Sequence, residues 1–313
     1  MGRTIGVLAA EHIAAALVEN NQIVGSVRIF PDASNESDYL EGMPTEEICQ
    51  RIVQQIELAR ADQELDAVGV GFPGIILNGA VEESPNLPQV KGQNLGVALA
   101  ALLGQRGISA PVQILNDADA TAAGIAATRG HLDKLIRVWT LGSGIGFGRY
   151  PQMNMVGEGG HSVVTLDPKE NFCRCGGVGH LEGIMGHRAM RLRFLDLEPE
   201  EVFEHAQSGD PRCGDFVKLW HRALAVATAT SIHMDGPGKF FLSGPNARFL
   251  QVGLLDLYLR EMVKMSPLQG SSLEVVSTSD EIAIIGAAVS AQHTVSGGPP
   301  SATSTPGGAK KTG

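Results

Sequence analysis

The sequence has little cysteine, few basic residues and no long apolar run. Only four cysteines occur in 313 residues, and two of them, Cys173 and Cys175, are one residue apart. This pattern argues against a disulfide framework and favours a metal site in a reducing compartment. The 24 basic residues against 34 acidic ones leave a net charge of -10, so neither nucleic acid nor an anionic membrane is an expected partner.

No segment reaches the roughly 18 uninterrupted apolar residues that a membrane span requires. The N-terminal stretch is apolar only in short runs, which Glu11, His12 and Glu19 interrupt, and this is typical of a first strand rather than a signal peptide. We therefore expect a cytoplasmic protein without a membrane partner. A chain of this length is too long for one ordinary core and favours two lobes.

Strand-like and helix-like segments alternate along the chain. Two β-type runs at 5–9 and 14–29 include an Asn-Asn turn at Asn20 and Asn21, as in a hairpin. Later segments predict helices at 45–61, 95–103 and 116–127, and strands at 67–74, 112–115, 136–148 and 239–244. Several of these strands end in glycine turns, which could surround one cleft.

The chain divides into two expected lobes and a tail. We expect an N-terminal lobe over 1–114, completed by a C-terminal helix at about 283–293, and a larger lobe over 115–282 that holds the sites described below. The stretch 294–313 consists mainly of Gly, Pro, Ser and Thr, so it cannot bury enough apolar surface to order itself and predicts a disordered tail.

Two thiols and two imidazoles lie close together in the sequence. His161, Cys173, Cys175 and His180 are all zinc-type ligands, and the glycines at 176, 177 and 179 let the backbone wrap an ion. Four protein ligands make a closed, structural zinc site. The alternative is a pair of buried free cysteines beside two unrelated histidines. The remaining cysteines are expected to be a core residue at 49 and a surface thiol at 213.

The stretch GEGGH at 157–161, followed by CRCGGVGHLEG at 173–183, resembles the signature of the ROK family, which comprises bacterial sugar kinases such as glucokinase together with sugar-responsive repressors. Further matches follow in order: GVGFPG with SPNLP, NDADATAAG, LGSGIGFG, LSGPN and IGAAVSA. The resemblance covers nearly the whole chain. It implies a two-lobed α/β fold of the sugar kinase, hexokinase and actin-like ATPase (ribonuclease H-like) type, with a cleft between the lobes, assembled as a homodimer or homotetramer.

The chain departs from the family pattern at two places. The third zinc cysteine of the family is His180 here, which keeps a ligand but changes its charge. The first phosphate motif, Asp followed two residues later by Gly-Gly-Thr, falls on VLAAE at 7–11, so every key residue of that motif is replaced. In such kinases the aspartate holds the magnesium network and the glycines let a hairpin approach the phosphate.

The resemblance implies a sugar site. Phosphorylation of a sugar hydroxyl needs a base within hydrogen-bond reach, and Asp117 matches the catalytic aspartate of the family. A helix-capping aspartate is the alternative, a task that Asp119 could also perform. The other implied sugar-binding residues are Gly74, Asn86, Asn116, Glu158, His161 and Glu182. His161 would then serve twice, with one ring nitrogen on zinc and the other facing the sugar.

The nucleotide site is the glycine turn LGSGIGFG, which follows a strand and could present backbone amides to the phosphates of ATP with Mg²⁺. Its expected contacts are Gly142, Ser143, Gly144 and Gly146, and the resemblance adds Gly244 beside the adenosine. The family usually has a run of glycines at that last position, where this chain has Pro245 and Asn246.

Three functions are compatible with these residues. The first is an ATP-dependent kinase of a glucose-like hexose or an N-acetyl amino sugar, with Asp117 as the base. The second is a sugar-binding pseudokinase, which the replaced VLAAE motif favours because binding and catalysis are separable. The third, a transcriptional repressor, is the least expected, since such repressors carry an N-terminal helix-turn-helix and this chain begins at its first strand.

Overall fold

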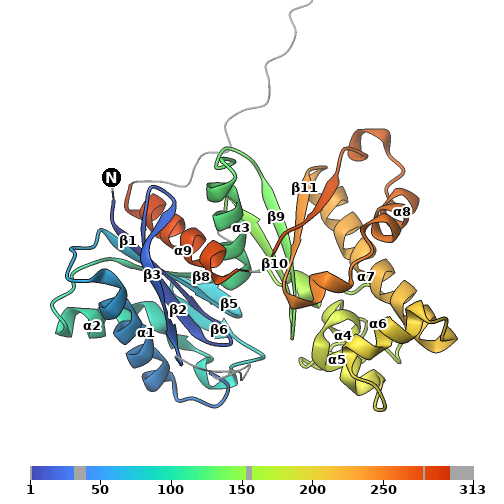
Figure 1. Ribbon diagram of the computed structural model, residues 1–313, viewed down its shortest axis with the longest axis horizontal. Helices are drawn as coiled ribbons and strands as arrows, with labels where there is room; N and C mark the ends of the chain where they lie inside the picture. Colours follow the sequence, from blue (N-terminus) through green and yellow to red (C-terminus); the bar gives the residue numbers. More distant parts are fainter. Residues whose placement is uncertain (1, 32–39, 153–156, 278, 297–313) are drawn as a thin grey trace, which may run out of the picture.

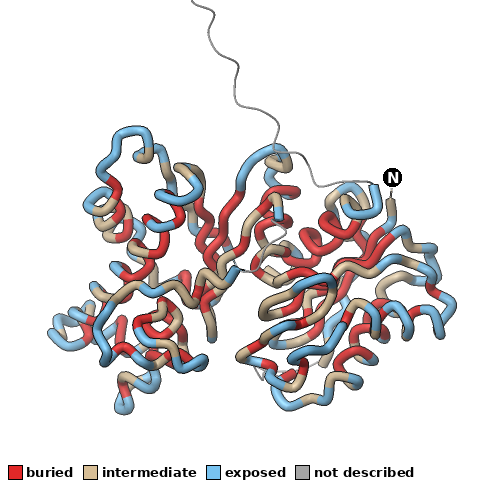
Figure 2. The backbone as a smooth tube through the Cα atoms, turned by 180° about the vertical axis from the view of Figure 1, so that it is seen from behind, coloured by how far each residue is buried: buried red, intermediate tan, exposed pale blue. Residues whose placement is uncertain are grey.

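The computed structural model describes residues 2–31, 40–152, 157–277 and 279–296, which form two lobes side by side (Figure 1). Each lobe is built on its own sheet, with helices on both faces. The buried residues gather along the central strands of each lobe, as the red tube in Figure 2 shows, so each lobe has its own core. Among the described helices, none combines the length and apolarity that crossing a membrane requires.

The sheet of the first lobe has the strand order β3-β2-β1-β4-β8. Strands β1 to β3 pair antiparallel, whereas β1, β4 and β8 are parallel. Helices α1 and α2 cover one face of this sheet and α9 covers the other. The bounds of these elements are β1 Thr4–Ala9, β2 Ile13–Glu19, β3 Gln22–Phe30, α1 Thr45–Arg60, β4 Ala67–Phe72, α2 Leu95–Gln105, β8 Val112–Asn116 and α9 Asp280–Val295.

The hairpin predicted at Asn20 and Asn21 is confirmed. Both residues have a positive φ, 53° and 61°, which asparagine tolerates better than most residues and which a two-residue hairpin turn requires. Strand β2 is buried on both faces, because Ile13 and Leu17 pack toward α1 and α2 while Ala14 packs toward α9. This explains why β2 is apolar throughout rather than alternating.

The sheet of the second lobe has the strand order β10-β9-β11-β12. Helix α3 covers one face, and α7 and α8 cover the other. The stretch 136–148, predicted as one strand with a terminal turn, is a hairpin, in which β9 and β10 pair antiparallel on either side of the turn at 142–144. The bounds are α3 Asp117–Thr128, β9 Ile136–Leu141, β10 Ile145–Tyr150, α7 Pro211–Asp235, β11 Lys239–Ser243, α8 Val252–Met262 and β12 Ser272–Val275.

Smaller elements complete the lobes. A third sheet has the order β5-β6-β7 and lies beside the first-lobe sheet, and short helices lie at the open end of the second lobe (Figure 1). Their bounds are β5 Ile75–Leu77, β6 Ala80–Glu83, β7 Gln93–Asn94, α4 Glu182–Met185, α5 His187–Arg193 and α6 Pro199–Gln207, with 3-10 turns η1 Pro88–Val90, η2 Gly159–His161, η3 Pro245–Phe249 and η4 Ser266–Leu268. The disordered tail was predicted from 294, but α9 continues to Val295. The rest of that prediction, residues 297–313, lies outside the described residues.

Helices α3 and α9 pack against each other between the two sheets, and glycines allow their close approach. A Cβ atom on Gly124 would lie 1.8 Å from the carbonyl oxygen of Ile282, and one on Gly286 would lie 1.8 Å from that of Ala120. No side chain fits at either position without moving a backbone. Because α3 packs on both sheets, the proposed boundary at 114/115 remains a prediction.

Replacing Gly124 by Ala should destabilise the protein by about 1–3 kcal/mol, because the added methyl group forces α3 away from α9. The matched control is Gly104→Ala in α2, where a Cβ atom meets nothing within 4 Å. That variant should be unchanged or up to about 1 kcal/mol more stable, since alanine has the higher helix propensity. Urea unfolding of both variants measures the difference, and equal stabilities would contradict the role of this contact.

Candidate functional site

One cavity of about 260 Å³ opens between the two lobes. Its walls include every residue that was predicted for sugar or nucleotide: Gly74, Asn86, Asn116, Asp117, Gly142, Ser143, Gly144, Gly146, Glu158, His161, Glu182 and Gly244. The individual roles of these residues remain predictions. Side chains that had no predicted role also line the cavity, among them Ser84, Thr140 and Asp280.

Asp117 is the first residue of α3 and directly follows β8. The helix is capped by Asn116, whose Oδ1 accepts hydrogen bonds from Ala118 N at 2.9 Å and Asp119 N at 3.4 Å. The Nδ2 of Asn116 donates to Gly74 O at 2.9 Å, which ties the helix start to the loop after β4. Asn116 supplies the cap, although Asp117 Oδ1 also accepts a hydrogen bond from Ala118 N at 2.9 Å, and Asp117 lines the cavity.

The two aspartates of α3 face different surroundings. Burial is the main reason that the pKa of Asp117 is raised to about 6, and the nearby Glu158 and Glu11 carboxylates contribute to this shift. Burial also raises the pKa of Asp119 to about 7, but this carboxylate accepts a hydrogen bond from Arg149 N at 2.8 Å. Asp119 therefore ties α3 to β10. It does not cap the helix, which was the alternative role considered for it from the sequence.

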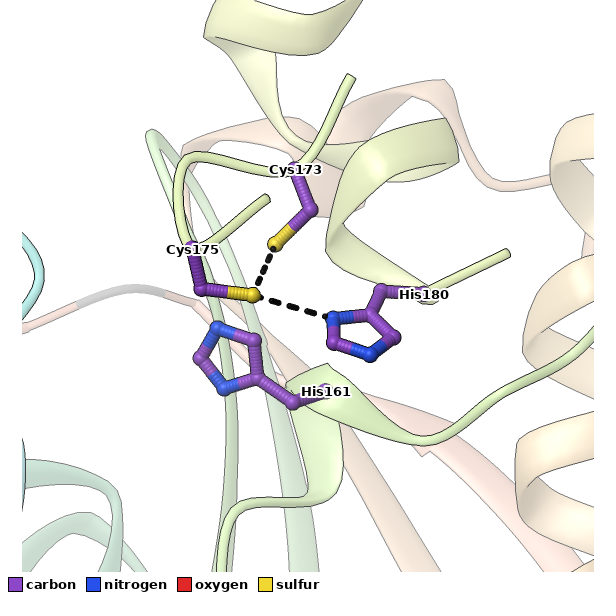
Figure 3. A group of neighbouring side chains, drawn as sticks. All are labelled: His161, Cys173, Cys175 and His180. Carbon is purple, nitrogen blue, oxygen red and sulfur yellow. Dashed lines mark hydrogen bonds between the residues drawn. The ribbon is translucent and has the colours of Figure 1, made fainter. Parts of the chain in front are cut away.

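The predicted metal ligands converge. One ligand atom from each of His161, Cys173, Cys175 and His180 lies within 4.8 Å of the others, and Figure 3 shows the side chains turned toward a common centre. Cys175 Sγ lies 3.3 Å from Cys173 Sγ and 3.2 Å from His180 Nδ1. The Nε2 atom of His161 is buried and has no hydrogen-bond partner among the described residues. Two thiols with two imidazoles suit a tetrahedral metal ion, which would satisfy that nitrogen.

The backbone around this cluster is held by local pairing. Val164 N donates to Gly179 O at 2.8 Å and Leu181 N to Ser162 O at 2.9 Å, so the segment with His161 and the segment with His180 form a short ladder. A Cβ atom on Gly177 would lie 2.0 Å from Cε1 of His180, so any other residue there would displace the imidazole. Arg193 forms an ion pair with the buried Glu170, which anchors the intervening loop to α5.

Two carboxylates connect the cluster to the cavity. Glu158 Oε2 lies 3.6 Å from Nδ1 of His161, the ring nitrogen opposite the buried Nε2. Glu182 Oε1 lies 3.6 Å from Cys173 Sγ, while its Oε2 accepts a hydrogen bond from Ile145 N at 3.1 Å, at the end of the glycine turn. Glu182 therefore touches both the metal-type cluster and the turn predicted for phosphates.

The glycine turn lies between β9 and β10. Gly142 N donates to Gly144 O at 3.0 Å, and Asn246 Nδ2 donates to Gly142 O at 3.1 Å. Gly244 has a φ of 95°, and a Cβ atom there would lie 2.3 Å from the carbonyl oxygen of Leu141, so this position accepts only glycine without strain. Gly244 is thus packed directly against the backbone of β9 at Leu141.

The turn between β1 and β2, at the position of the first phosphate motif, has two polar side chains that contact residues of other elements across the cavity. His12 Nε2 lies 2.7 Å from Asp280 Oδ2, and Asp280 raises the pKa of His12 above its ordinary value. Glu11 Oε1 accepts a hydrogen bond from Ser143 Oγ at 3.4 Å. These contacts join residues 268 and 132 positions apart, so no local pattern could have predicted them.

The cavity is strongly acidic. No lysine or arginine is among its described lining residues, whereas carboxylates come from both lobes: Glu11, Glu41, Asp117, Glu158, Glu182 and Asp280. Such a surface offers many acceptors to a neutral polyhydroxylated ligand.

The two remaining cysteines lie outside the cavity. Cys49 is a core residue as expected, but Cys213 is also buried, at the start of α7, and is not the predicted surface thiol.

A cleft between two sheets, with a strand-end carboxylate on one side and a glycine turn on the other, defines a sugar-kinase type of protein. The chain belongs to the ROK family, whose model matches residues 5–294. A glucokinase from Pyrobaculum calidifontis is 29% identical over 261 residues, covering 77% of this chain and 84% of that protein. A xylose repressor from Caldicellulosiruptor bescii is 25% identical over 252 residues, covering 70% of this chain and 60% of the repressor.

Solved structures share the fold. A ROK hexokinase from Thermus thermophilus matches with a TM-score of 0.74 and 24% identity, over 94% of this chain and 99% of that one. A ROK glucokinase from Streptomyces griseus, in complex with glucose and AMPPNP, matches with a TM-score of 0.67 and 22% identity, over 93% and 99%. The fold is therefore the two-lobed sugar kinase and actin-like ATPase fold that the sequence predicted.

The raised pKa of Asp117 predicts a gain in stability for Asp117→Asn. The ionised carboxyl destabilises the folded state, so the effect should be present above pH about 6 and absent below the unfolded pKa of roughly 3.9. We expect a gain of about 1–3 kcal/mol at pH 8 and none at pH 3.5, measured by denaturant unfolding. Asp215→Asn, at an exposed site, should show no gain, and a loss of stability in Asp117→Asn at pH 8 would contradict the burial argument.

Proposed function

We propose that this protein is an ATP-dependent sugar kinase that phosphorylates a glucose-like hexose or an N-acetyl amino sugar. The observation that carries the proposal is the position of Asp117. Its carboxylate, at the end of β8, lines the same cavity as the glycine turn between β9 and β10. The glucokinase among the relatives, and the related structure that contains glucose with AMPPNP, support the same reaction class.

In this mechanism, Asp117 accepts the proton of the attacking sugar hydroxyl. Its pKa of about 6 keeps most of the carboxyl ionised at neutral pH yet makes it a stronger base than an exposed aspartate. Its position at the start of α3 holds the carboxylate in a fixed direction. Glu158, His161 and Glu182 would orient the sugar through its other hydroxyls, and the backbone of the glycine turn would hold the donor phosphates.

Magnesium would accompany the nucleotide and neutralise part of the charge on its phosphates. The family aspartate that holds the magnesium network is Val7 here, and this side chain offers no ligand. We therefore assign no residue of this chain as a magnesium ligand, and the phosphates of the nucleotide would hold the ion.

The cluster of His161, Cys173, Cys175 and His180 would hold a structural zinc ion. Four protein ligands leave no open position, so the metal would supply rigidity rather than activate water. With Nε2 of His161 on the metal, Nδ1 would remain beside Glu158 and face the sugar side.

A homodimer or homotetramer is the assembly we expect from the family.

A second candidate is a protein that binds sugar without transferring phosphate. It is favoured by the replacement of the phosphate hairpin by VLAAE and by the absence of lysine and arginine from the described cavity lining. Both features weaken the phosphate side of the cleft and leave the sugar side intact.

Replacing Asp117 by Asn should lower the rate constant for phosphorylation by about 10²–10⁴ and leave sugar affinity within about threefold, because the base acts in the transition state. A coupled assay of ADP release with a panel of hexoses and amino sugars measures the rate, and calorimetry measures the affinity. If wild type binds sugar but never releases ADP, the second candidate function replaces the first. Equal losses of rate and affinity would assign Asp117 to binding alone.

Elemental analysis of the purified protein should find one zinc ion per chain. The double variant Cys173→Ser, Cys175→Ser should lose it, while Cys49→Ala, which removes a thiol from the first-lobe core, should keep it. Sugar affinity should fall in the double variant because His161 is no longer held in place. Chelator treatment of wild type tests the same link without mutation, and metal-free protein with unchanged sugar affinity would refute it.

A further inference from the structure

The glycine turn between β9 and β10 is braced by one segment of the second lobe. This bracing segment, residues 182–187, comprises α4 and the first residue of α5. Oε2 of Glu182 accepts a hydrogen bond from Ile145 N at 3.1 Å, at one end of the turn. At the other end, His187 N donates to Gly142 O at 3.1 Å. The bracing segment therefore holds both ends of the turn that we assign to the donor phosphates.

The bracing segment is anchored in the core of the second lobe. Ile184 and Met185 are buried in the same apolar cluster as Leu141 and Ile145, the residues on either side of the turn. The carbonyl oxygen of Met185 also accepts a hydrogen bond from Trp220 Nε1 at 3.3 Å, on α7. The segment thus has a fixed place in the lobe, against which the turn is held.

The segment and the turn approach each other closely. A Cβ atom on Gly186 would lie 2.9 Å from Ser143 O, and one on Gly144 would lie 2.8 Å from Oε2 of Glu182. The carboxylate therefore rests directly on the turn. Glycine has the greatest backbone freedom, and backbone amides bind a phosphate only while they point toward it. A turn of this composition consequently gains affinity when a partner fixes it before the ligand arrives.

The second oxygen of Glu182 faces the metal-type cluster. Oε1 lies 3.6 Å from Cys173 Sγ and 3.9 Å from Nε2 of His161, and both residues belong to the predicted metal ligands. The side chain of Glu182 is only 14% exposed, so little water separates it from its neighbours. One carboxylate therefore links the candidate metal ligands to the main chain of the glycine turn.

We propose that Glu182 is a positioning residue for the phosphoryl donor, because it holds the glycine turn in place and makes donor binding depend on the metal-type cluster. The proposal rests on the proposed function, in that it assigns the turn to ATP. The family resemblance implied only a sugar contact for Glu182. A carboxylate oxygen has two lone pairs, so Oε1 can accept a sugar hydroxyl while Oε2 holds the turn.

Hydrogen exchange of the Ile145 amide measures this contact directly. Replacing Glu182 by Ala removes the acceptor, so the exchange rate of Ile145 should rise about tenfold or more. Glu182→Gln keeps an oxygen acceptor on a side chain of the same length, so its exchange rate should rise less than about fivefold. Equal exchange in wild type and Glu182→Ala would overturn the positioning role.

Gly144→Ala tests the same contact with the carboxylate still present, and it serves where Glu182→Ala does not fold. The added methyl group displaces Oε2 of Glu182, so Ile145 exchange should rise here too. The matched control is Glu158→Ala. Glu158 lines the same cavity and lies 3.6 Å from His161 Nδ1, but among the described residues it forms no hydrogen bond with the turn. A similar rise in this control would overturn the assignment to Glu182.

Removal of the metal tests the link to the cluster. Chelation of zinc-loaded wild type, followed by desalting, should raise Ile145 exchange and weaken binding of AMPPNP with Mg²⁺ about five- to tenfold in calorimetry without sugar. Glu182→Ala should bind AMPPNP as weakly as metal-free wild type. Because its contact is already lost, chelation should change its AMPPNP affinity less than about twofold. Equal effects of chelation in both proteins would overturn the coupling.

The proposed kinase function fails separately. Exchange at Ile145 and binding of AMPPNP need no turnover, so a wild type that never releases ADP would remove the catalytic proposal, while these measurements still decide the role of Glu182. If wild type does not bind AMPPNP at all, the assignment of the glycine turn to the donor is wrong, and the inference on Glu182 falls with it.

Discussion

The contact between α3 and α9 is the constraint on which the two-lobed arrangement depends. Each helix covers a different sheet, and Gly124 and Gly286 let the two backbones meet where a Cβ atom would lie 1.8 Å from a carbonyl oxygen. The first residues of both helices, Asp117 and Asp280, line the cavity. The same helix pair therefore joins the lobes and delivers two carboxylates to the cleft.

The strands and helices of the first lobe, together with α3, β9 and β11, could be predicted because each has a local signal, whereas α4 to α8 and β12 were not predicted. The apolar runs, the Asn-Asn turn and the strand-end glycines all mark their elements, and the family motifs located the residues that line one cavity. The contacts of Glu11 with Ser143 and of His12 with Asp280 could not be predicted, because they join segments that only the folded lobes bring together. The burial of Cys213 was missed for the same reason: only tertiary packing on α7 covers it.

The two ends of the cleft differ in the charged residues that line them. Near the metal-type cluster, the Glu158 carboxylate lies 3.6 Å from the His161 imidazole, and both groups can hydrogen-bond to hydroxyl groups. Glu182 links that end to the glycine turn. At the β1–β2 turn, the residues of the phosphate motif are replaced, and Glu11 and His12 contact Ser143 and Asp280 instead. Sugar recognition and the β1–β2 part of the phosphate side thus rest on different segments, and they can change independently.

The helix crossing has one mechanical consequence. If the lobes rotate about the place where α3 meets α9, points near that axis travel least and points at the cleft mouth travel farthest. Asp117 and Gly124 lie on the same helix, whereas Glu11 lies on the β1–β2 turn of the first lobe and Ser143 on the β9–β10 turn of the second. A rotation of the lobes would therefore break the contact between Glu11 and Ser143, while Asp117 would keep its position relative to the helix that joins the lobes.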